Sequence, residues 1–388
     1  MIRSEGEGCD GIGSVGHVVI APDKFKGSLT AAEVAARVAA GLRRACPGVR
    51  TVELPVADGG DGTVDAAVAA GCRRVPAEVT GPTGQPVSAA FALRDATAVI
   101  EAAQACGLSR LADGTRAPLT ATSRGVGELI LAAVRAGANR IVLGLGGVAT
   151  SDGGAGLAQA LGARLLDDTG RELPPGGGAL ARLAKLHPPE MLPGIEVLVA
   201  SDVDNPLLGP AGAAAVYGPQ KGASPEDVEL LDAALSRWAD LAEEASGFRV
   251  RDDPGAGAAG GLGFASLLFL RATLRPGIEL LLDMLGFAAH LDGADLVITG
   301  EGSLDRQTLR GKAPAGVARA AGFHDPPVPV VAVSGACSLS KAQLRAVGIT
   351  AAYALTSIEP DISRSIAEAG RLTEELAARI AAEWLRPG

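Results

Sequence analysis

Short apolar, β-branched segments alternate with alanine-rich segments of helical periodicity along most of the chain. Residues 17–20 precede a helical pattern over 30–45, and residues 140–143 precede one over 154–161. Alternation of this kind is typical of parallel sheets whose strands are joined by crossover helices. The pattern therefore predicts an α/β fold, with further strands at 52–56, 98–101, 195–200, 296–299, 328–333 and 351–354.

Two helix starts are marked by residues that favour the N-cap position. Thr30 is followed three residues later by Glu33, the spacing at which a hydroxyl and an acid satisfy each other's backbone N–H groups. Ser224 is followed by a proline and two acids, which favour the first turn of a helix. Helices are therefore predicted to start at these two positions.

Length and charge narrow the class of protein. A chain of 388 residues exceeds what one hydrophobic core usually supports, so two domains are expected. The formal charge of −9 disfavours contact with nucleic acid or an acidic membrane surface. No segment approaches the ~20 apolar residues of a membrane span, and residues 1–16 are predicted to be a flexible extension without a signal segment. Five scattered cysteines, never in CxxC spacing, indicate a cytoplasmic protein without a structural zinc site.

Two loops rich in aspartate and glycine carry the most informative chemistry. Residues 57–63 read Ala-Asp-Gly-Gly-Asp-Gly-Thr, and residues 200–206 read Ala-Ser-Asp-Val-Asp-Asn-Pro. Carboxylates close together on a loop supply hard oxygen ligands for Mg²⁺, while glycines let backbone N–H groups approach an anion. The loops therefore favour a magnesium-dependent enzyme that handles phosphorylated ligands, with a kinase as the leading interpretation.

Lysine is rare in this chain, and three of its six lysines lie in glycine-containing turns. These are Lys26 in Phe-Lys-Gly-Ser, Lys221 in Gly-Pro-Gln-Lys-Gly and Lys312 in Gly-Lys-Ala-Pro. A lysine binds phosphate as a flexible point charge, so each is a candidate for an anion site. A solvated turn cation is the alternative interpretation of each one.

A rival nucleotide signal follows the strand predicted at 140–143. Residues 144–149 match the GxGxxA pattern of dinucleotide-binding enzymes, so an NAD(P)-dependent oxidoreductase is the alternative function. Against it, Ser151 and Asp152 prolong the loop and add an acid where a pyrophosphate would lie. Residues 255–260 match GxGxxG, but the Asp-Asp-Pro before them interrupts any preceding strand. A non-catalytic nucleotide-binding protein is a third possibility.

Two common enzyme signatures are missing from the sequence. The Gly311-Lys312 pair lacks the upstream glycine and following hydroxyl of a Walker A motif, which excludes the usual P-loop kinases. No GxSxG motif occurs, which removes the simplest hydrolase interpretation. A kinase with a less familiar nucleotide site remains.

Many separated motifs together form one pattern, at 21–28, 55–63, 146–154, 201–207, 218–222 and 299–303, together with Asp305, Gln307, Thr308, Gly311 and Lys312. This pattern resembles that of the type I glycerate kinases, a bacterial family that phosphorylates D-glycerate with ATP. The resemblance runs from about His17 to the C-terminal helices and departs from the commonest pattern at Lys24, Asp61, Ser151 and Ser201.

The resemblance implies two α/β domains, with one inserted into the other. A Rossmann- or flavodoxin-like parallel-sheet domain would comprise 17–80 and 290–388, and a restriction-endonuclease-like domain would comprise 81–289. The boundaries follow turn residues near 80–82 and 291–293. The active site is expected in the cleft between the domains.

Phosphoryl transfer needs an oriented alcohol, neutralised phosphate oxygens, a metal and a group that accepts the hydroxyl proton. We hypothesise that Asp202 and Asp204 hold Mg²⁺, with a turn or helix cap as the alternative. Asp23 or Asp58 could accept the proton, and Glu301 could share this work. The candidate catalytic residues are Asp23, Lys26, Asp58, Lys221 and Glu301.

Further residues are expected to bind substrate or nucleotide. The lysines would bind the phosphates or the carboxylate of glycerate, and glycine-rich segments would add backbone donors. The candidates are Ser28, Gly59, Gly60, Thr122, Ser123, Gly146, Gly147, Asp152, Gly257, Gly260, Asp305, Gln307 and Lys312, of which Thr122 and Ser123 could equally cap a helix. The resemblance implies ATP, Mg²⁺ and D-glycerate as ligands and favours 2-phosphoglycerate over 3-phosphoglycerate as product. Association into a homo-oligomer stays open.

Overall fold

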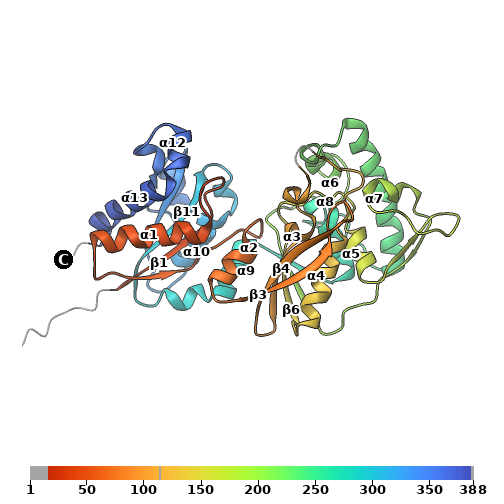
Figure 1. Ribbon diagram of the computed structural model, residues 1–388, viewed down its shortest axis with the longest axis horizontal. Coiled ribbons are helices and arrows are strands. Elements are labelled where there is room, and N and C mark those ends of the chain that lie inside the picture. Colours follow the sequence, from red (N-terminus) through yellow and green to blue (C-terminus); the bar gives the residue numbers. More distant parts are fainter. Residues whose placement is uncertain (1–15, 113–114, 386–388) are drawn as a thin grey trace, which may run out of the picture. The chain divides into compact units, whose positions relative to one another are not determined.

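The computed structural model describes residues 16–112 and 115–385, so the extension predicted at 1–16 lies outside the described residues apart from Gly16. The chain divides into two compact units (Figure 1). Unit 1 comprises Met1–Pro55, Gly286–Arg310 and Pro314–Gly388, and unit 2 comprises Val56–Leu285 and Gly311–Ala313. Both ends of the chain therefore belong to unit 1.

Unit 1 is built on a five-stranded parallel sheet in the order β13-β12-β11-β1-β2. Its helices α1 and α13 pack side by side over one face, where Val34, Val38 and Leu376 meet Val18 and Ile20 of the sheet. The strands are β1 (His17–Pro22), β2 (Arg50–Glu53), β11 (Ala294–Leu304), β12 (Val330–Cys337) and β13 (Ala351–Ala354). The helices are α1 (Ala31–Ala45), α10 (Ala313–Gly322), α11 (Lys341–Ala346), α12 (Ile362–Ala367) and α13 (Ala369–Trp384).

Unit 2 contains a six-stranded mixed sheet in the order β10-β9-β6-β5-β4-β3. Strands β5, β6, β9 and β10 run parallel, whereas β3, β4 and β5 are paired antiparallel. The strands are β3 (Arg73–Thr80), β4 (Pro86–Arg94), β5 (Thr97–Glu101), β6 (Arg140–Gly144), β9 (Glu196–Ala200) and β10 (Thr273–Arg275). A separate antiparallel pair is formed by β7 (Arg164–Leu166) and β8 (Lys185–His187).

Helices cover both faces of this mixed sheet. Ile141 and Leu143 of β6 point into the larger core, while Val142 between them points into a smaller core beneath α2 and α9. Because successive strand side chains alternate between faces, a strand buried on both sides reads as one apolar run. The helices are α2 (Thr63–Ala69), α3 (Ala102–Cys106), α4 (Arg124–Arg135), α5 (Ala155–Ala160), α6 (Ala213–Tyr217), α7 (Pro225–Ser246), α8 (Ala258–Phe269) and α9 (Gly277–Leu285).

The predicted α/β alternation is confirmed, and each predicted strand overlaps an observed one. Both predicted helix starts are also confirmed, because Thr30 and Ser224 each form a reciprocal capping box with the acid three residues later. The pattern did not reveal β3 and β4, whose segments contain Pro76, Pro86 and several polar residues. These two strands make the sheet of unit 2 mixed, whereas the alternation of strands and helices indicated parallel pairing.

The first domain boundary differs from the predicted one. The division into units falls after Pro55 rather than near Thr80, and the return to unit 1 falls at Gly286 rather than near 290. Segment 56–80 belongs to unit 2 because α2 packs against its sheet and β3 pairs with β4. The turn at 80–82 is therefore a hairpin connection within one unit.

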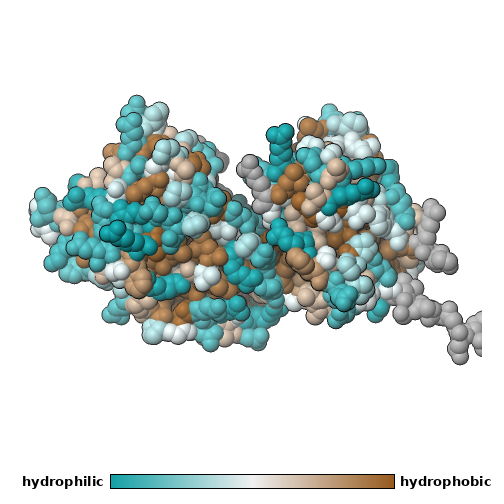
Figure 2. Space-filling view, turned by 180° about the vertical axis from the view of Figure 1, so that it is seen from behind, coloured by the Kyte–Doolittle hydropathy of each residue, from teal (hydrophilic) through white to brown (hydrophobic). Residues whose placement is uncertain are grey.

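On the face of the molecule in Figure 2, hydrophilic and hydrophobic residues are interspersed over each unit. None of the described helices combines the length and apolar character needed to cross a membrane.

Candidate active site

In unit 1, candidate residues gather where the direction of strand addition reverses. The chain passes from β1 to β2 on one side, and β11, β12 and β13 are added on the other side. Ligands of open parallel sheets bind at the carboxyl ends of the strands beside such a switch point. Asp23 follows β1 directly, and its N–H donates to the carbonyl of Gly300 on β11 at 2.8 Å. The structure therefore brings Asp23 close to the strand position of Glu301.

A tight turn after β1 presents Lys26. Within this turn, the N–H of Phe25 donates to the carbonyl of Leu29 at 2.8 Å, and the Ser28 hydroxyl donates to the carbonyl of Phe25 at 3.1 Å. Ser28 therefore stabilises the turn, while the exposed Lys26 can reach an anion. A Cβ atom on Gly302 of β11 would lie 3.2 Å from the backbone nitrogen of Lys26, so the turn lies against the end of that strand.

The end of β11 holds a buried carboxylate and its hydroxyl donor. Glu301 is 7% exposed, and the buried Thr308 hydroxyl donates to its carboxylate at 2.5 Å. The Thr308 oxygen in turn accepts from the N–H of Asp305 at 3.1 Å, and the Asp305 carboxylate accepts from the N–H of Gln307 at 2.7 Å. Asp305 and Gln307 thus shape the loop after β11, while Lys312, half-buried, belongs by its contacts to unit 2.

In unit 2, the glycines of two loops pack against one another. The carbonyl of Gly59 accepts from the N–H of Gly146 at 3.3 Å. A Cβ atom on Gly144 would lie 2.4 Å from that carbonyl oxygen, and one on Gly146 would lie 2.5 Å from the Cα atom of Gly60. Gly147 is likewise pressed against the Asp61 carboxylate. The glycines at 144–147 are therefore required for loop-to-loop packing, which accounts for the dinucleotide-like pattern.

Replacing Gly146 by alanine should push these two loops apart, because the new methyl group has no space. We expect kcat of the enzyme to fall by about tenfold to a hundredfold, the range expected when reacting groups are displaced by about 1 Å. Steady-state kinetics of Gly146→Ala beside Gly48→Ala, where a Cβ would meet nothing within 4 Å, tests this. Equal kcat values for the two variants would refute the packing argument.

Asp202, just after β9, and Asp58, near the start of the loop 57–63, belong to one acidic group. Loss of water around the Asp202 carboxyl raises its pKa to about 6, although the residue as a whole is exposed. The negative charges of Asp58 and Glu279 raise this pKa further, while the N–H of Gly277, which donates to Asp202 at 3.2 Å, opposes them. The backbone of Asp58 leaves no room for a Cβ atom on Gly277. Because Gly277 has no side chain, the loop 57–63 can pack against the start of α9.

Asp204 lies apart from this acidic group in its interactions. Burial raises the pKa of the Tyr217 hydroxyl, and the negative charge of Asp204 raises it further. The Tyr217 hydroxyl donates to the side-chain oxygen of Asn205 at 2.6 Å. Within residues 16–112 and 115–385, no three histidine, cysteine or carboxylate side chains converge closely enough to hold a metal ion alone. A metal here would need further ligands from a substrate or water.

A second cluster in unit 2 is buried and centres on Asp152. This residue is 1% exposed, and its carboxylate accepts from the Ser123 N–H at 2.8 Å and the Ser123 hydroxyl at 2.9 Å. It also accepts from the N–H groups of Gly154 at 3.1 Å and Gly156 at 3.2 Å, at the start of α5. Asp152 thus occupies the position where a dinucleotide pyrophosphate would bind, which is a physical reason against the oxidoreductase alternative. Thr122 supports the same turn by accepting from the N–H of Arg124.

Lys221 lies in the same cluster and is only 2% exposed. Its ammonium donates to the carbonyl of Thr150 at 2.5 Å, and a Cβ atom on Gly260 would lie 2.8 Å from it. Burial lowers the pKa of Lys221 to about 8, and the negative charge of Asp152 opposes this shift. The structure therefore brings Lys221, Asp152, Ser123 and Gly260 together. The sequence identifies all four as candidates but does not predict that they form one cluster.

Two hydroxyls beside Lys221 were not identified from the sequence. Thr150 and Ser151 are fully buried, and their hydroxyls have no partner of normal hydrogen-bond geometry within the described part of the chain. The neighbour of Thr150 is the thiol of Cys106, a weak donor whose pKa burial raises to about 12. Buried hydroxyls without partners are uncommon, and here they belong to two consecutive residues, the first of which binds the Lys221 ammonium through its carbonyl.

Gly257 and Gly260 serve the packing of α8. A Cβ atom on Gly257 would lie 2.2 Å from the carbonyl oxygen of Pro206, and one on Gly260 would lie 2.1 Å from that of Thr150. Gly260 and its neighbours Ala259 and Gly261 all have positive φ angles, so the helix starts irregularly. These glycines allow the segments around Asn205 and Thr150 to approach the helix closely.

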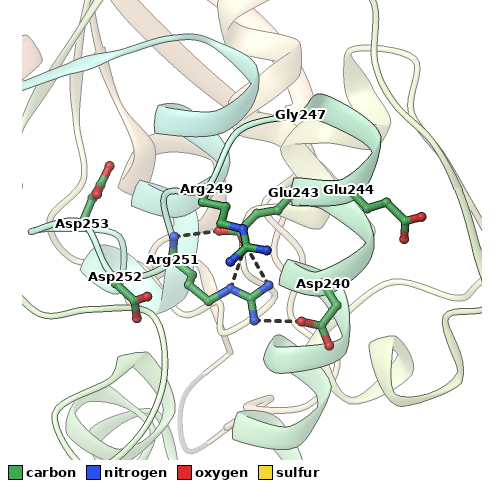
Figure 3. Close-up of a pocket in the computed structure, with 8 residues that line it drawn as sticks. All are labelled: Asp240, Glu243, Glu244, Gly247, Arg249, Arg251, Asp252 and Asp253. Carbon is green, nitrogen blue, oxygen red and sulfur yellow. Dashed lines mark hydrogen bonds and ion pairs between the residues drawn. The ribbon is translucent and has the colours of Figure 1, made fainter.

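The pocket drawn in Figure 3 is lined by residues other than these candidates. It is formed by the end of α7 and the segment after it, and Arg251 there pairs with Glu243 at 2.7 Å and with Asp240 at 2.8 Å (Figure 3). None of the residues predicted to form the site lines it. Its internally paired charges are typical of a structural ion-pair network.

Comparison with known proteins assigns the chain to a family. Residues 18–385 match the glycerate kinase family. A glycerate kinase of Bacillus subtilis is 47% identical over 94% of this chain and 97% of its own length, and a glycerate 2-kinase of Escherichia coli is 45% identical over 88% and 91%. The crystal structure of a protein described as glycerate kinase 2 of Salmonella typhimurium is 43% identical, with a TM-score of 0.83, over 95% of this chain and 98% of that one. This chain therefore belongs to the glycerate kinase family.

Proposed function

We propose that this protein transfers the γ-phosphoryl group of ATP to the 2-hydroxyl of D-glycerate, giving ADP and 2-phosphoglycerate. The observation that carries the proposal is the similarity, at 45–47% identity over most of both chains, to proteins named glycerate kinase and glycerate 2-kinase. In the reaction the bond between the β,γ-bridging oxygen and the γ-phosphorus breaks and a new oxygen–phosphorus bond forms. The hydroxyl proton passes to a base.

The finer fold assignment rests on strand order. Numbered along unit 1 alone, the parallel sheet has the order 2-1-3-4-5, which supports a flavodoxin-like domain. We propose that unit 2 is the restriction-endonuclease-like domain inserted into it.

Magnesium fits the acidic group of unit 2. Asp202 and Asp58 carry negative charges that oppose one another, and a divalent cation would offset this repulsion. Mg²⁺ usually takes one or two carboxylates and completes its shell with phosphate oxygens and water, so three protein ligands are not required. Asp202 and Asp58 would therefore hold the ion directly, and Asp204, the second ligand predicted from the sequence, would act through a bound water molecule. When bound, Mg²⁺ supplies charge neutralisation on the phosphate oxygens.

The remaining roles follow from burial and charge. Asp23 and Glu301, at the switch point of unit 1, are the candidates for accepting the hydroxyl proton, besides Asp58. Lys26 is exposed and suits a phosphate. Lys221, with the unpartnered hydroxyls of Thr150 and Ser151, forms a set of donors that suits the carboxylate of glycerate.

A coupled assay with ATP, Mg²⁺ and D-glycerate tests this function. We expect ADP formation that depends on both Mg²⁺ and D-glycerate, and a phosphorus NMR spectrum of the product that matches 2-phosphoglycerate. A spectrum of 3-phosphoglycerate would contradict the assigned hydroxyl alone. Absence of ADP formation, together with NADH fluorescence quenching on binding, would favour the oxidoreductase instead.

A further inference from the structure

Glu101 is a buried carboxylate that the reaction scheme above does not use. It ends β5 and is 4% exposed. One of its carboxylate oxygens accepts from the N–H of Gly62 at 3.1 Å and from the N–H of Val64 at 3.3 Å. Both donors lie where the loop 57–63 enters α2, so Glu101 binds the end of this loop from a neighbouring strand.

The N-cap residue at that end of the loop gives α2 no side-chain cap. Gly62 is the N-cap of α2, has a left-handed φ of 94° and offers no side chain to cap the helix. The first N–H groups of a helix need acceptors from outside the helix, and Glu101 supplies one. Inside the loop, the Thr63 hydroxyl donates to the carbonyl of Gly60 at 2.6 Å. Glu101 therefore connects the loop to the sheet at Gly62, the glycine that precedes α2.

The other end of the loop carries Asp58. Its backbone lies against Gly277, and its charge acts on the carboxyl of Asp202. The middle of the loop packs against Gly144, which ends β6 and pairs with Glu101, and against Gly146 just after it. A loop held at Gly62 and packed at Gly59 constrains the backbone next to Asp58.

We propose that Glu101 is a positioning residue, which holds the loop 57–63 so that the Asp58 carboxylate lies in its working place beside Asp202. The inference rests on the proposed function for its effect on turnover. It concerns the backbone of the loop, so its structural part can be measured without substrate.

Burial of the carboxylate is otherwise unfavourable, which supports a dedicated role. Desolvation raises the pKa of Glu101 to about 7, and the charges of Asp61 and Asp65, on the loop and on α2, raise it too. The neighbouring α3 carries no charged residue, and the adjacent end of β6 is Gly144. Because the clamped site raises this pKa, the protonated carboxyl favours the clamped state over a hydrated, open one, so the hold on the loop should weaken as pH rises through 7.

Three variants of the full-length protein test the proposal. Glu101→Ala removes the acceptor, whereas Glu101→Gln keeps an oxygen of the same reach. Glu243→Ala is the matched control, because Glu243 is also buried and accepts from two backbone N–H groups, those of Val250 and Arg251, both at 2.9 Å. Each variant is examined by amide hydrogen exchange and by steady-state kinetics with ATP, Mg²⁺ and D-glycerate.

We expect Glu101→Ala to speed exchange in peptides covering 57–69 and to lower kcat by about tenfold to a hundredfold, with little change in KM. Glu101→Gln should recover most of kcat, and the ratio of wild-type to Glu101→Gln kcat should fall between pH 6 and pH 8, because only the wild-type side chain becomes charged. Glu243→Ala should speed exchange around 248–253 and keep kcat.

The proposal is overturned by unchanged exchange at 57–69, by wild-type kcat in Glu101→Ala, or by an equal loss of kcat in Glu243→Ala. If Glu101→Ala does not fold, a kcat ratio for Glu101→Gln that is flat with pH overturns it. If the wild-type protein does not phosphorylate glycerate, the proposed function fails separately, and the exchange data for 57–69 still decide whether Glu101 holds the loop.

Discussion

Replacing Asp202 by asparagine should lower kcat for glycerate phosphorylation by about a hundredfold or more. Metal-ion catalysis contributes several kcal/mol to transition-state stabilisation, and each ~1.4 kcal/mol corresponds to a tenfold change in rate. The asparagine side chain would keep the size and one oxygen of the aspartate but lose the negative charge that opposes Asp58 and Glu279 in the wild-type protein. The variant should therefore fold while binding Mg²⁺ more weakly.

Magnesium titrations of activity provide the measurement. Asp202→Asn should need more Mg²⁺ for half-maximal rate, whereas Asp252→Asn, an exposed acid elsewhere in unit 2, should behave as the wild type. Asp204→Asn should have the smaller effect of the two predicted ligands, because the charge of Asp204 acts on Tyr217. An unchanged kcat and magnesium requirement in Asp202→Asn would refute the assignment of the metal site.

Replacing Asp152 by asparagine should reduce the free energy of unfolding by about 3 kcal/mol, since hydrogen bonds to a buried charged group contribute ~1.5–3 kcal/mol each. The carboxylate accepts four hydrogen bonds, from Ser123, Gly154 and Gly156, and both oxygens are used. An asparagine side chain presents one oxygen and one NH₂ group. In either orientation the NH₂ group faces at least one backbone N–H, so that donor loses its acceptor.

Urea unfolding of the variant at pH 7 gives this free energy directly. Asp167→Asn is the matched control, because the Asp167 carboxylate also accepts from two backbone N–H groups and a hydroxyl, of Thr169 and Arg171, but on the surface. There, water replaces the lost partners and the cost should be much smaller. Equal unfolding midpoints for Asp152→Asn and the wild type would show that the buried network contributes nothing to stability.

The sequence alone determined the features that depend on neighbouring residues. The capping boxes at Thr30 and Ser224 are visible because both partners lie within one turn of a helix. The central strands are visible because burial on both faces of a sheet demands a continuous apolar run, as in Ile141–Leu143. The loop at 57–63 is also visible as a candidate site, because its glycines and acids are adjacent in the chain.

Only the tertiary structure decided which distant residues act on one another. Gly144 and Gly146 resemble a dinucleotide motif in sequence, yet their lack of side chains serves the approach of Gly59 and Gly60. In the sequence, Lys221 is either an anion-binding residue or a solvated turn cation, and only folding shows that it is buried against Thr150. Glu101 closes a predicted strand like many other acids, and its bonds to Gly62 and Val64 arise because folding brings β5 beside the start of α2. Local patterns record the conformation of a segment, whereas burial and hydrogen bonding of a polar group depend on the residues that other segments bring to it.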